Sequence, residues 1–432
     1  MSKNKLIPEL RFPEFQNQGE WEKDSIDNQF DLQDGYPFSS FDFTKDTKDS
    51  KQVIRITDIN NQNSNEEKVY LPNSKIKDLE ISKYEVHSGD LLLSLTGAAG
   101  FNFFIWNTYS GFINQRTMKI SPKKQDNEAL KFLLEPLIHS KINSIGTGQN
   151  NNLSKDALKE IEFPYPKPKE QRKLSSFITN FNDLIAAHSQ KLDLLQDHKK
   201  GLMQNLFPQE GEKVPKVRFK EFEKDGEWVE RTLIDTANKK IKWSFTGGPF
   251  GSNLMASDYS ANGFRIIQLQ NIGDGVFNDD NKIYASMVKA DELLSCNIYA
   301  GDIIISKMGD PVGRACIIPD NLHRCIMASD GIRLVVDETK YSKYFIYSLI
   351  NSKRIREAIE KRATGSTRKR IGLDTLREIE LIVPKSQQEQ QKIASCLSSL
   401  DSLITAQAEK IEQLKLHKKG LMQGLFPKII EN

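Results

Sequence analysis

Ten residues in the second half of the chain combine concentrated positive charge with small side chains. Residues 361–370 read KRATGSTRKR, in which five residues are basic and none is acidic. Lysine and arginine neutralise phosphates, arginine also pairs in bidentate fashion with guanine, and glycine lets a backbone approach its partner closely. A charged run is more often only a solvated surface, so both interpretations stay open. The candidate nucleic-acid contacts are Lys361, Arg362, Thr364, Gly365, Ser366, Thr367, Arg368, Lys369 and Arg370.

The equivalent place in the first half carries a polar but uncharged segment. Residues 146–152 read GTGQNNN. Asparagine and glutamine are the usual readers of adenine, although such a run also suits a flexible turn. Two loops at equivalent places with different base-reading chemistry indicate two domains that read different sequences. The candidate contacts here are Thr147, Gln149, Asn150, Asn151 and Asn152.

A second candidate surface covers residues 239–253, which interleave basic, aromatic, glycine and hydroxyl residues. Glycine allows close approach to a phosphate or base edge, and serine and asparagine supply hydrogen bonds. Its candidate contacts are Lys242, Gly247, Gly248, Ser252 and Asn253. The less basic counterpart at residues 34–40 contributes Ser39 and Ser40. Pro37–Ser40 lacks the glycine found in Pro249–Ser252, which leaves the geometry of the first loop open.

No catalytic constellation accompanies these surfaces. The sequence has no G-x-x-x-x-G-K-[ST] phosphate loop, no Asn-Pro-Pro-aromatic motif for holding a target amine, no dinucleotide-binding glycine fingerprint and no H-E-x-x-H. Residues 96–100 suit a turn better than a cofactor loop. Cys316, His323 and Cys325 lie close in sequence, but a fourth zinc ligand is not evident. We therefore expect a protein that is not an enzyme and binds neither a metal nor a cofactor.

Composition places the chain among ordinary globular proteins. Its 432 residues are 38% hydrophobic and 28% charged, which suits two to three domains with normal cores. The longest apolar runs are strand-sized, and the N-terminus lacks the apolar core of a signal peptide, so we expect a cytoplasmic protein without membrane contact. Four cysteines without a C-x-x-C spacing argue against a zinc ribbon or a disulfide framework. Because the net charge is only +3, any nucleic-acid-binding surface must come from local clustering.

Internal repetition organises the whole chain. The segment from Glu170 to Pro208 ends HKKGLMQNLFP, and the segment from Glu389 to Pro427 ends HKKGLMQGLFP, an offset of 389 − 170 = 219. A second motif, P-x-x-R-F followed by G-E-W, ends at Trp21 and again at Trp228, an offset of 228 − 21 = 207. A repeat of about 210 residues is a duplicated domain rather than a solenoid.

Each well-matched segment has the pattern of a long amphipathic helix. Apolar residues alternate four and three apart, the signature of a coiled-coil seam. Pro168 can occupy the first helical position, Ser386 and Glu389 form a capping box, and the prolines that end the pattern cannot continue a helix. His188 and Gln407 take equivalent seam positions, where polar residues cost stability but fix register. Matched seams favour pairing of the two helices; packing of each helix on its own domain is the alternative.

The remaining regions mix short strands, helices and loops. Residues 53–57 and 264–268 read as strands, and residues 127–145 and 342–361 read as helices. The predicted fold class is therefore α/β, with α+β left open. The architecture is two tandem mixed domains separated by two long helices.

This combination resembles the DNA-specificity subunits of Type I restriction-modification systems. The order P-x-x-R-F, G-E-W, variable domain and E-Q-led helix ending K-K-G-L-M-Q-x-L-F-P occurs twice and covers essentially the whole chain. Pro249–Ser252 and the G-D-I-I-I-S run at Gly301–Ser306 also match. The resemblance implies target-recognition domains at residues 1–168 and 209–385, and spacer helices at residues 169–208 and 386–427 that pack as an antiparallel coiled coil.

The resemblance also implies partners and chemistry. Each domain would read one half of a bipartite, asymmetric site in double-stranded DNA. Two modification subunits would hold S-adenosylmethionine and methylate adenine, and two restriction subunits would translocate and cut DNA using ATP and Mg. The chain itself would be a non-catalytic member of this host-defence complex. A self-contained methyltransferase and a stand-alone DNA-binding adaptor are the rival interpretations.

Overall fold

The chain divides into two compact units in the computed structural model. The first unit comprises Met1–Ala187 with Ile411–Asn432, and the second comprises His188–Lys410. The structure describes residues 6–60, 68–78, 80–88, 90–95, 103–106, 110–123, 134, 154–365 and 368–427. The predicted turn at residues 96–100 and the predicted loop at residues 146–152 lie outside the described residues, as does the predicted helix at 127–145 apart from Leu134.

The described residues of the first unit form three small sheets. One sheet pairs β1 (Glu22–Ser25) with β10 (Glu162–Tyr165). The second has the order β2 (Phe30–Asp34), β9 (Thr117–Pro122), β6 (Leu91–Ser94) and β7 (Phe103–Ile105). The third has the order β4 (Val69–Pro72), β3 (Ser50–Ile54), β8 (Gly111–Ile113) and β5 (Glu85–Val86). The short helices are α1 (Ile26–Gln29), α2 (Ile56–Asn60), α3 (Asn73–Asp78) and α5 (Lys155–Lys159).

The second unit repeats this set of sheets. One sheet pairs β11 (Val229–Thr232) with β21 (Glu380–Val383). The next has the order β12 (Phe245–Gly247), β20 (Gly331–Leu334), β17 (Ile303–Ser306) and β18 (Ala315–Ile317). The largest has the order β13 (Tyr259–Ser260), β15 (Ile283–Ala285), β14 (Phe264–Ile267), β19 (Arg324–Met327) and β16 (Asn297–Tyr299). The short helices are α7 (Met287–Glu292), α8 (Lys343–Ile350), α9 (Lys353–Arg362) and α10 (Leu373–Arg377).

The two units share one topology, as the duplicated sequence predicts. The order β2-β9-β6-β7 corresponds to β12-β20-β17-β18, and β4-β3-β8-β5 corresponds to β15-β14-β19-β16. Among the described strands, each unit has one parallel pair, β3 with β8 and β14 with β19, beside antiparallel neighbours. The predicted mixed architecture of two tandem units is therefore confirmed.

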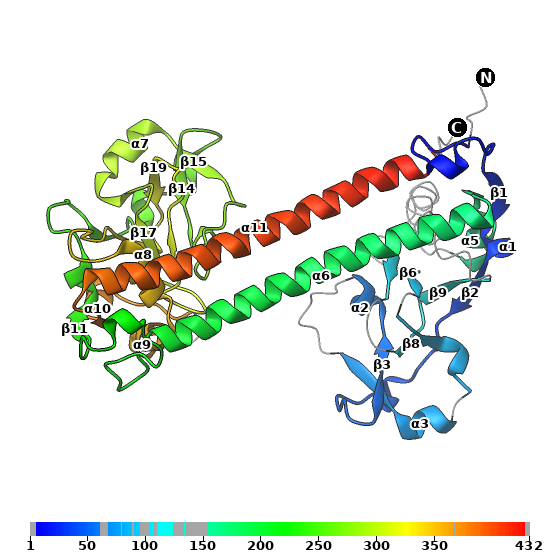
Figure 1. The fold of residues 1–432 in the computed structure, drawn as a ribbon, viewed down its shortest axis with the longest axis horizontal. Coiled ribbons are helices and arrows are strands. Elements are labelled where there is room, and N and C mark those ends of the chain that lie inside the picture. Colours follow the sequence, from blue (N-terminus) through cyan, green and yellow to red (C-terminus); the bar gives the residue numbers. More distant parts are fainter. Residues whose placement is uncertain are drawn as a thin grey trace. The chain divides into compact units, whose positions relative to one another are not determined.

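Two long helices begin and end close to where the sequence predicts. α6 spans Pro168–Leu206 and α11 spans Gln387–Leu425 (green, and orange to red, in Figure 1). Pro168 takes the first position of α6, as expected of a residue that has no N–H to leave unpaired. The ends of both helices also enter the cores of the units: Leu206 and Leu397 belong to the main core of the second unit.

Within the first unit the two helices lie side by side and run antiparallel. Leu174 of α6 shares a hydrophobic core with Leu425 of α11. Farther along α6, Asn182 Oδ1 accepts a hydrogen bond from Lys418 Nζ at 2.6 Å. Later residues of α6 therefore meet earlier residues of α11, which is the antiparallel sense.

The second unit shows the same pairing at the polar seam positions. Gln407 Nε2 lies 2.8 Å from His188 Nδ1 and donates to the His188 carbonyl oxygen, also at 2.8 Å. Lys199, eleven residues after His188, forms a 2.6 Å ion pair with Asp401, six residues before Gln407. His188 and Gln407 are equivalent residues of the repeat, since 407 − 188 = 219. The two polar residues therefore satisfy each other, and the predicted structural role of His188 needs no ligand.

Cysteines at His188 and Gln407 are expected to become cross-linked within one chain by a short bis-maleimide reagent. The reason is that these side chains contact each other across the helix pair. The background is Cys396→Ser, because Cys396 is the one native cysteine that is not buried. The matched control pairs His188→Cys with Glu409→Cys, an exposed position two residues on and so on the far side of α11. Mass spectrometry should find the intrachain product for the first pair only; its absence would refute the pairing of the seams.

A buried ion pair explains why both halves repeat the P-x-x-R-F and E-Q motifs. Arg218 donates from Nε and Nη2 to the two carboxylate oxygens of Glu389, at 2.7 and 2.8 Å. Arg11 donates two hydrogen bonds to the Glu170 carboxylate in the same bidentate geometry, both at 2.7 Å. Such a fork ties the segment before each variable region to the first turn of a long helix.

Three local predictions need correction. Ser386 Oγ does accept from the Gln388 N–H, but the Glu389 carboxylate bonds Arg218 and not the helix start, so tertiary contact overrides the predicted capping box. The strand predicted at residues 53–57 ends at Ile54, and α2 begins at Ile56. The helix predicted at residues 342–361 is two helices, α8 and α9, which are interrupted at Asn351 and Ser352.

Candidate nucleic-acid interface

An open pocket lies at one edge of the sheets in the second unit. The parallel strands β14 and β19 end side by side, and β12 ends next to the start of β20. The connections that leave these strand ends enclose a pocket of about 160 Å³, with Phe250, Gly251, Tyr259, Gln268, Gln270 and Asp330 among its lining residues. Ligands of open sheets commonly bind outside the carboxyl ends of parallel strands.

A glycine allows one wall of the pocket to form. Gly248 donates its N–H to the carbonyl oxygen of Gly331 at 2.8 Å, and a Cβ on Gly248 would lie only 1.8 Å from the carbonyl oxygen of Ala328. Gly35 has the same place in the first unit, because its Cβ would lie 1.9 Å from the carbonyl oxygen of Asn114. Any side chain at either position would collide with backbone.

The segment Pro37–Ser40, which lacks the second glycine, differs in part from Pro249–Ser252, because Phe38 is 7% exposed whereas Phe250 is 85% exposed. A Cβ on Gly251 would meet nothing within 4 Å, so serine is equally acceptable there. Both loops form a short 3₁₀ turn, at Ser40–Asp42 and at Gly251–Asn253. Ser39 caps the first turn by accepting from the Phe41 N–H at 3.4 Å.

Aromatic side chains stand out on both loops. Phe41 is 98% exposed and Phe250 is 85% exposed. Ser40, Ser252 and Asn253 are exposed beside them, whereas Gly247 lies within β12. The predicted contact residues of these loops are thus accessible, except for the partly buried glycines.

Lys242 is not brought together with the rest of its predicted surface. It lies before the start of β12, where the Val335 N–H donates to the Ser244 carbonyl, whereas Gly248 lies after the end of β12, where its N–H donates to the Gly331 carbonyl. The strand separates the two. Lys242 instead lies over the ring of Trp243, 4.2 Å from its centroid.

The basic segment forms a closed loop after α9. Thr364 and Arg370 exchange backbone hydrogen bonds at 2.9 and 2.8 Å. Gly365 has φ 107°, a conformation that disfavours any side chain. The base of the loop is fixed to the preceding sheet, since Gly309 donates to Lys369 and Ile371 donates to Lys307. Ser366 and Thr367 lie outside the described residues.

The expectation that no acid offsets this basic cluster is wrong. The acids come from outside the ten residues: Glu360 directly precedes them, Glu380 follows ten residues later, and Glu210 and Asp330 are remote in sequence. The pairs are Lys361 with Glu210 (3.0 Å), Arg362 with Glu380 (3.9 Å), Lys369 with Glu360 (2.5 Å) and Arg370 with Asp330 (3.3 Å). Such exposed pairs are worth ~0–1 kcal/mol, so the cations can still exchange an acid for a phosphate.

One of these pairs joins the two predicted surfaces. Asp330 lines the pocket next to Phe250 and Gly251, and it also holds the guanidinium of Arg370. Arg370 further contacts the sulfur of Met308 at 3.7 Å. The structure therefore brings the 248–253 loop and the basic loop to one face of the second unit.

Alanine at Arg362, Arg368, Lys369 and Arg370 together is expected to weaken DNA binding and flatten its salt dependence. Each phosphate that the protein no longer neutralises should lower the slope of log affinity against log salt by roughly 0.9. DNA-binding titrations of the assembled complex at several salt concentrations measure this slope. Lys415→Ala, an exposed cation on α11 that pairs with Glu412, is the control. If affinity, slope and site choice all stay unchanged, the loop is only a solvated surface.

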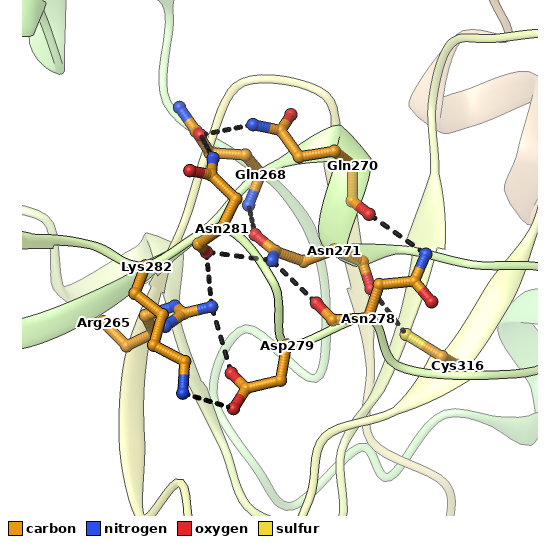
Figure 2. A network of polar contacts seen from close by, with 9 residues as sticks. All are labelled: Arg265, Gln268, Gln270, Asn271, Asn278, Asp279, Asn281, Lys282 and Cys316. Atoms are coloured by element: carbon orange, nitrogen blue, oxygen red, sulfur yellow. Dashed lines mark hydrogen bonds and ion pairs between the residues drawn. The ribbon is translucent and has the colours of Figure 1, made fainter. Parts of the chain in front are cut away.

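A polar turn at the floor of the pocket was not predicted from the sequence. Gln268 follows β14, and Gln268 and Gln270 both line the pocket. Figure 2 shows that their carboxamides belong to a network with Asn271, Asn278 and Asn281. Beneath it, the buried Arg265 bonds the carbonyl of Asn281 and lies 3.1 Å from Asp279.

The same turn exists in the first unit with different side chains. Gln268 N–H donates to Asn271 Oδ1 at 2.9 Å, and Arg55 N–H donates to Asp58 Oδ2 at 2.8 Å. Arg55 thus takes the place of Gln268. A repeated pattern, I-Q-L-Q-N-I at 267–272 and I-R-I-T-D-I at 54–59, is the signal that would have found both turns. The other candidate contacts of the first unit, Thr147, Gln149, Asn150, Asn151 and Asn152, lie outside the described residues.

The described residues contain neither a metal site nor a membrane span. No cluster of three or more potential metal ligands occurs among them. Cys316 and Cys325 are buried free thiols, and this burial raises the pKa of each to about 12. Among the helices of this part of the chain, none is long and apolar enough to cross a membrane.

These features define a class: a mixed domain followed by a long helix, present in two copies whose loops differ in chemistry. Two segments, residues 18–197 and 267–416, match the family model described as Type I restriction modification DNA specificity domain. The match spans most of the chain, which therefore belongs to this family.

Individual relatives agree with the family. The chain is 22% identical over 353 residues to the Type I restriction enzyme MjaVIII specificity subunit of Methanocaldococcus jannaschii, covering 79% of each protein. Its fold is similar to a Type-I restriction-modification system S subunit from M. genitalium, with a TM-score of 0.56 and 16% identity over 98% of this chain and 100% of that one. A chain from a study of complex assembly and conformational transition of the type I R-M system has a TM-score of 0.52 and 14% identity over 93% of this chain and 96% of its own.

Proposed function

We propose that this chain is the DNA-specificity subunit of a Type I restriction-modification complex, in which each unit reads one half of a bipartite, asymmetric DNA site. The observation that carries the proposal is duplication with divergence. The two units share one strand topology, yet the matched turns present Arg55 in one and Gln268 in the other. Two domains with the same fold but different base-contacting side chains are suited to a split DNA site whose two halves differ in sequence.

The chemistry belongs to partners in this proposal. Two modification subunits carry S-adenosylmethionine and methylate adenine, and two restriction subunits use ATP and Mg to translocate and cut DNA. This chain supplies the DNA sequence specificity and no catalytic group, and it acts in the cytoplasm, where these partners bind DNA. The target-recognition domains are residues 1–168 and 209–385, joined by spacer helices at 169–208 and 386–427.

Methylation mapping in cells that supply the modification subunit tests the proposal. Adenine methylation should appear at one split, asymmetric sequence only when this chain is present. The purified chain alone should bind no S-adenosylmethionine in isothermal titration. Micromolar cofactor binding by the pure chain would instead support a self-contained methyltransferase, and site-specific DNA binding without any methylation would support a stand-alone adaptor.

A further inference from the structure

The pocket of the second unit presents one carboxamide to solvent. Gln270 lies on the short turn Leu269–Asn271 that follows β14, and its side chain is exposed while lining the pocket. Its backbone carbonyl accepts a hydrogen bond from Asn278 Nδ2 at 3.2 Å. The residue is therefore anchored at its main chain and accessible at its tip.

Gln268 fixes the orientation of that tip. Gln268 Oε1 accepts from Gln270 Nε2 at 2.8 Å and from Asn281 Nδ2 at 2.9 Å (Figure 2). Gln268 Nε2 also donates to the Tyr259 hydroxyl at 3.3 Å. Two donors on one oxygen determine which way the Gln268 amide faces. Gln270 then keeps one N–H and its carboxamide oxygen, and in the described part of the chain this oxygen accepts no hydrogen bond.

The turn beneath is held by buried groups. Asn271 is 1% exposed and donates from Nδ2 to the carbonyls of Asn278 and Asn281, at 2.8 and 3.2 Å. Arg265 is 4% exposed and also bonds the Asn281 carbonyl. A side chain on a turn that is fixed in this way loses little conformational entropy when it binds DNA.

We propose that Gln270 reads an adenine of the DNA half-site through its major-groove edge, with Gln268 and Asn281 as positioning residues. Adenine presents N7 as an acceptor and its N6 amine as a donor, and a carboxamide with a free N–H and a free oxygen complements both. Arg370, held by Asp330 at the rim of the pocket, supplies positive charge for the adjacent backbone. The proposal rests on the proposed function and specifies one contact within it.

The first unit supports a sequence-reading role for this turn. There Thr57 stands in the place of Gln270, and Arg55, which suits guanine, stands in the place of Gln268. The capping bond to the backbone N–H is the same in both units, but the side chains above it differ: the Arg55 guanidinium pairs with Asp58 at 3.3 Å, whereas the Gln268 carboxamide bonds Gln270 and Asn281.

The test uses the assembled complex of this chain with its modification subunits. After the wild-type site has been mapped, duplexes that carry every single base-pair change in it are compared for binding by wild type, Gln270→Ala and Asn321→Ala. Asn321 is an exposed amide before β19, at the opposite end of that strand from the pocket. Thermal unfolding checks that the variants fold equally well.

Gln270→Ala should lose discrimination at one A·T pair, in one half-site only, by about 5- to 150-fold. Asn321→Ala should retain the full preference. If wild type reads a split site and Gln270→Ala keeps every positional preference, or loses affinity equally for all duplexes, the assignment of Gln270 is wrong while the proposed function stands. If wild type reads no split site, both fail.

Discussion

Replacing Glu389 with alanine is expected to destabilise the second unit by about 3–5 kcal/mol, the cost of breaking a buried ion pair by removing one partner. The carboxylate accepts two hydrogen bonds from Arg218 and a third from Trp228 Nε1 at 3.1 Å. The Glu389 side chain is 1% exposed and that of Arg218 is 8% exposed, so water cannot replace the missing partner. The hydrogen bonds to Glu389 raise the pKa of Arg218. Arginine stays protonated in proteins even without such a partner, so the variant would leave a buried guanidinium without its counter-ion.

Hydrogen exchange of the β11 and β21 amides measures the free energy of unfolding of this unit. The matched control is Glu412→Ala, whose pair with Lys415 is exposed, and it should change stability by less than about 1 kcal/mol. Arg218→Met combined with Glu389→Leu should recover much of the stability, because replacing both partners leaves no unpaired charge. A destabilisation below about 1 kcal/mol for Glu389→Ala would contradict a structural role for the pair.

The long helices could be predicted because their signals are local. The seven-residue pattern of mostly apolar residues extends along both helices, and prolines mark the first position of α6 and lie two residues after the C-terminal end of each helix. The contact between His188 and Gln407 was not predicted, because antiparallel packing brings equivalent positions together only near the middle of the two helices, where these residues lie.

Several of the failed predictions share a cause, which is contact with distant segments. Asn351 interrupts the predicted helix because its side chain bonds both the N–H and the carbonyl of Ala315, which is far away in sequence. Glu389 was predicted to cap its own helix, but its carboxylate forms an ion pair with Arg218 instead. Asp330 and Glu210 meet the basic loop from remote positions, so its local charge overstated its free charge.

The sequence predicted the loops of the candidate site but not its polar turn. Charge and glycine content indicated the loops, and Gly248 does allow the pocket to close up against Ala328. The turn with Gln268 and Gln270 was missed because Gln268 was assigned to the end of a strand at residues 264–268 and Gln270 was not assigned to any element. Its capping asparagine and the matched aspartate at Asp58 are a recognisable turn signal.

Exchanging residues 230–383 for those of a relative with another specificity is expected to change one half of the recognised site completely and leave the other half unchanged. The segment contains the pocket, the basic loop and the turn with Gln270, and nearly all of the strand pair β11 and β21 moves with it. The graft must still pack on Leu206 and Leu397 of the long helices, so a donor with similar apolar residues facing them is required.

Methylation-site mapping in cells that supply the modification subunit is the most direct test of two-part reading. The parental chain, the donor chain and the exchanged chain are compared in the same host. Two-part reading predicts that the exchanged chain directs methylation to a split site with one half from each parent. If both halves change, or if the recognised site is continuous, the two units do not read DNA separately and two-part reading is refuted.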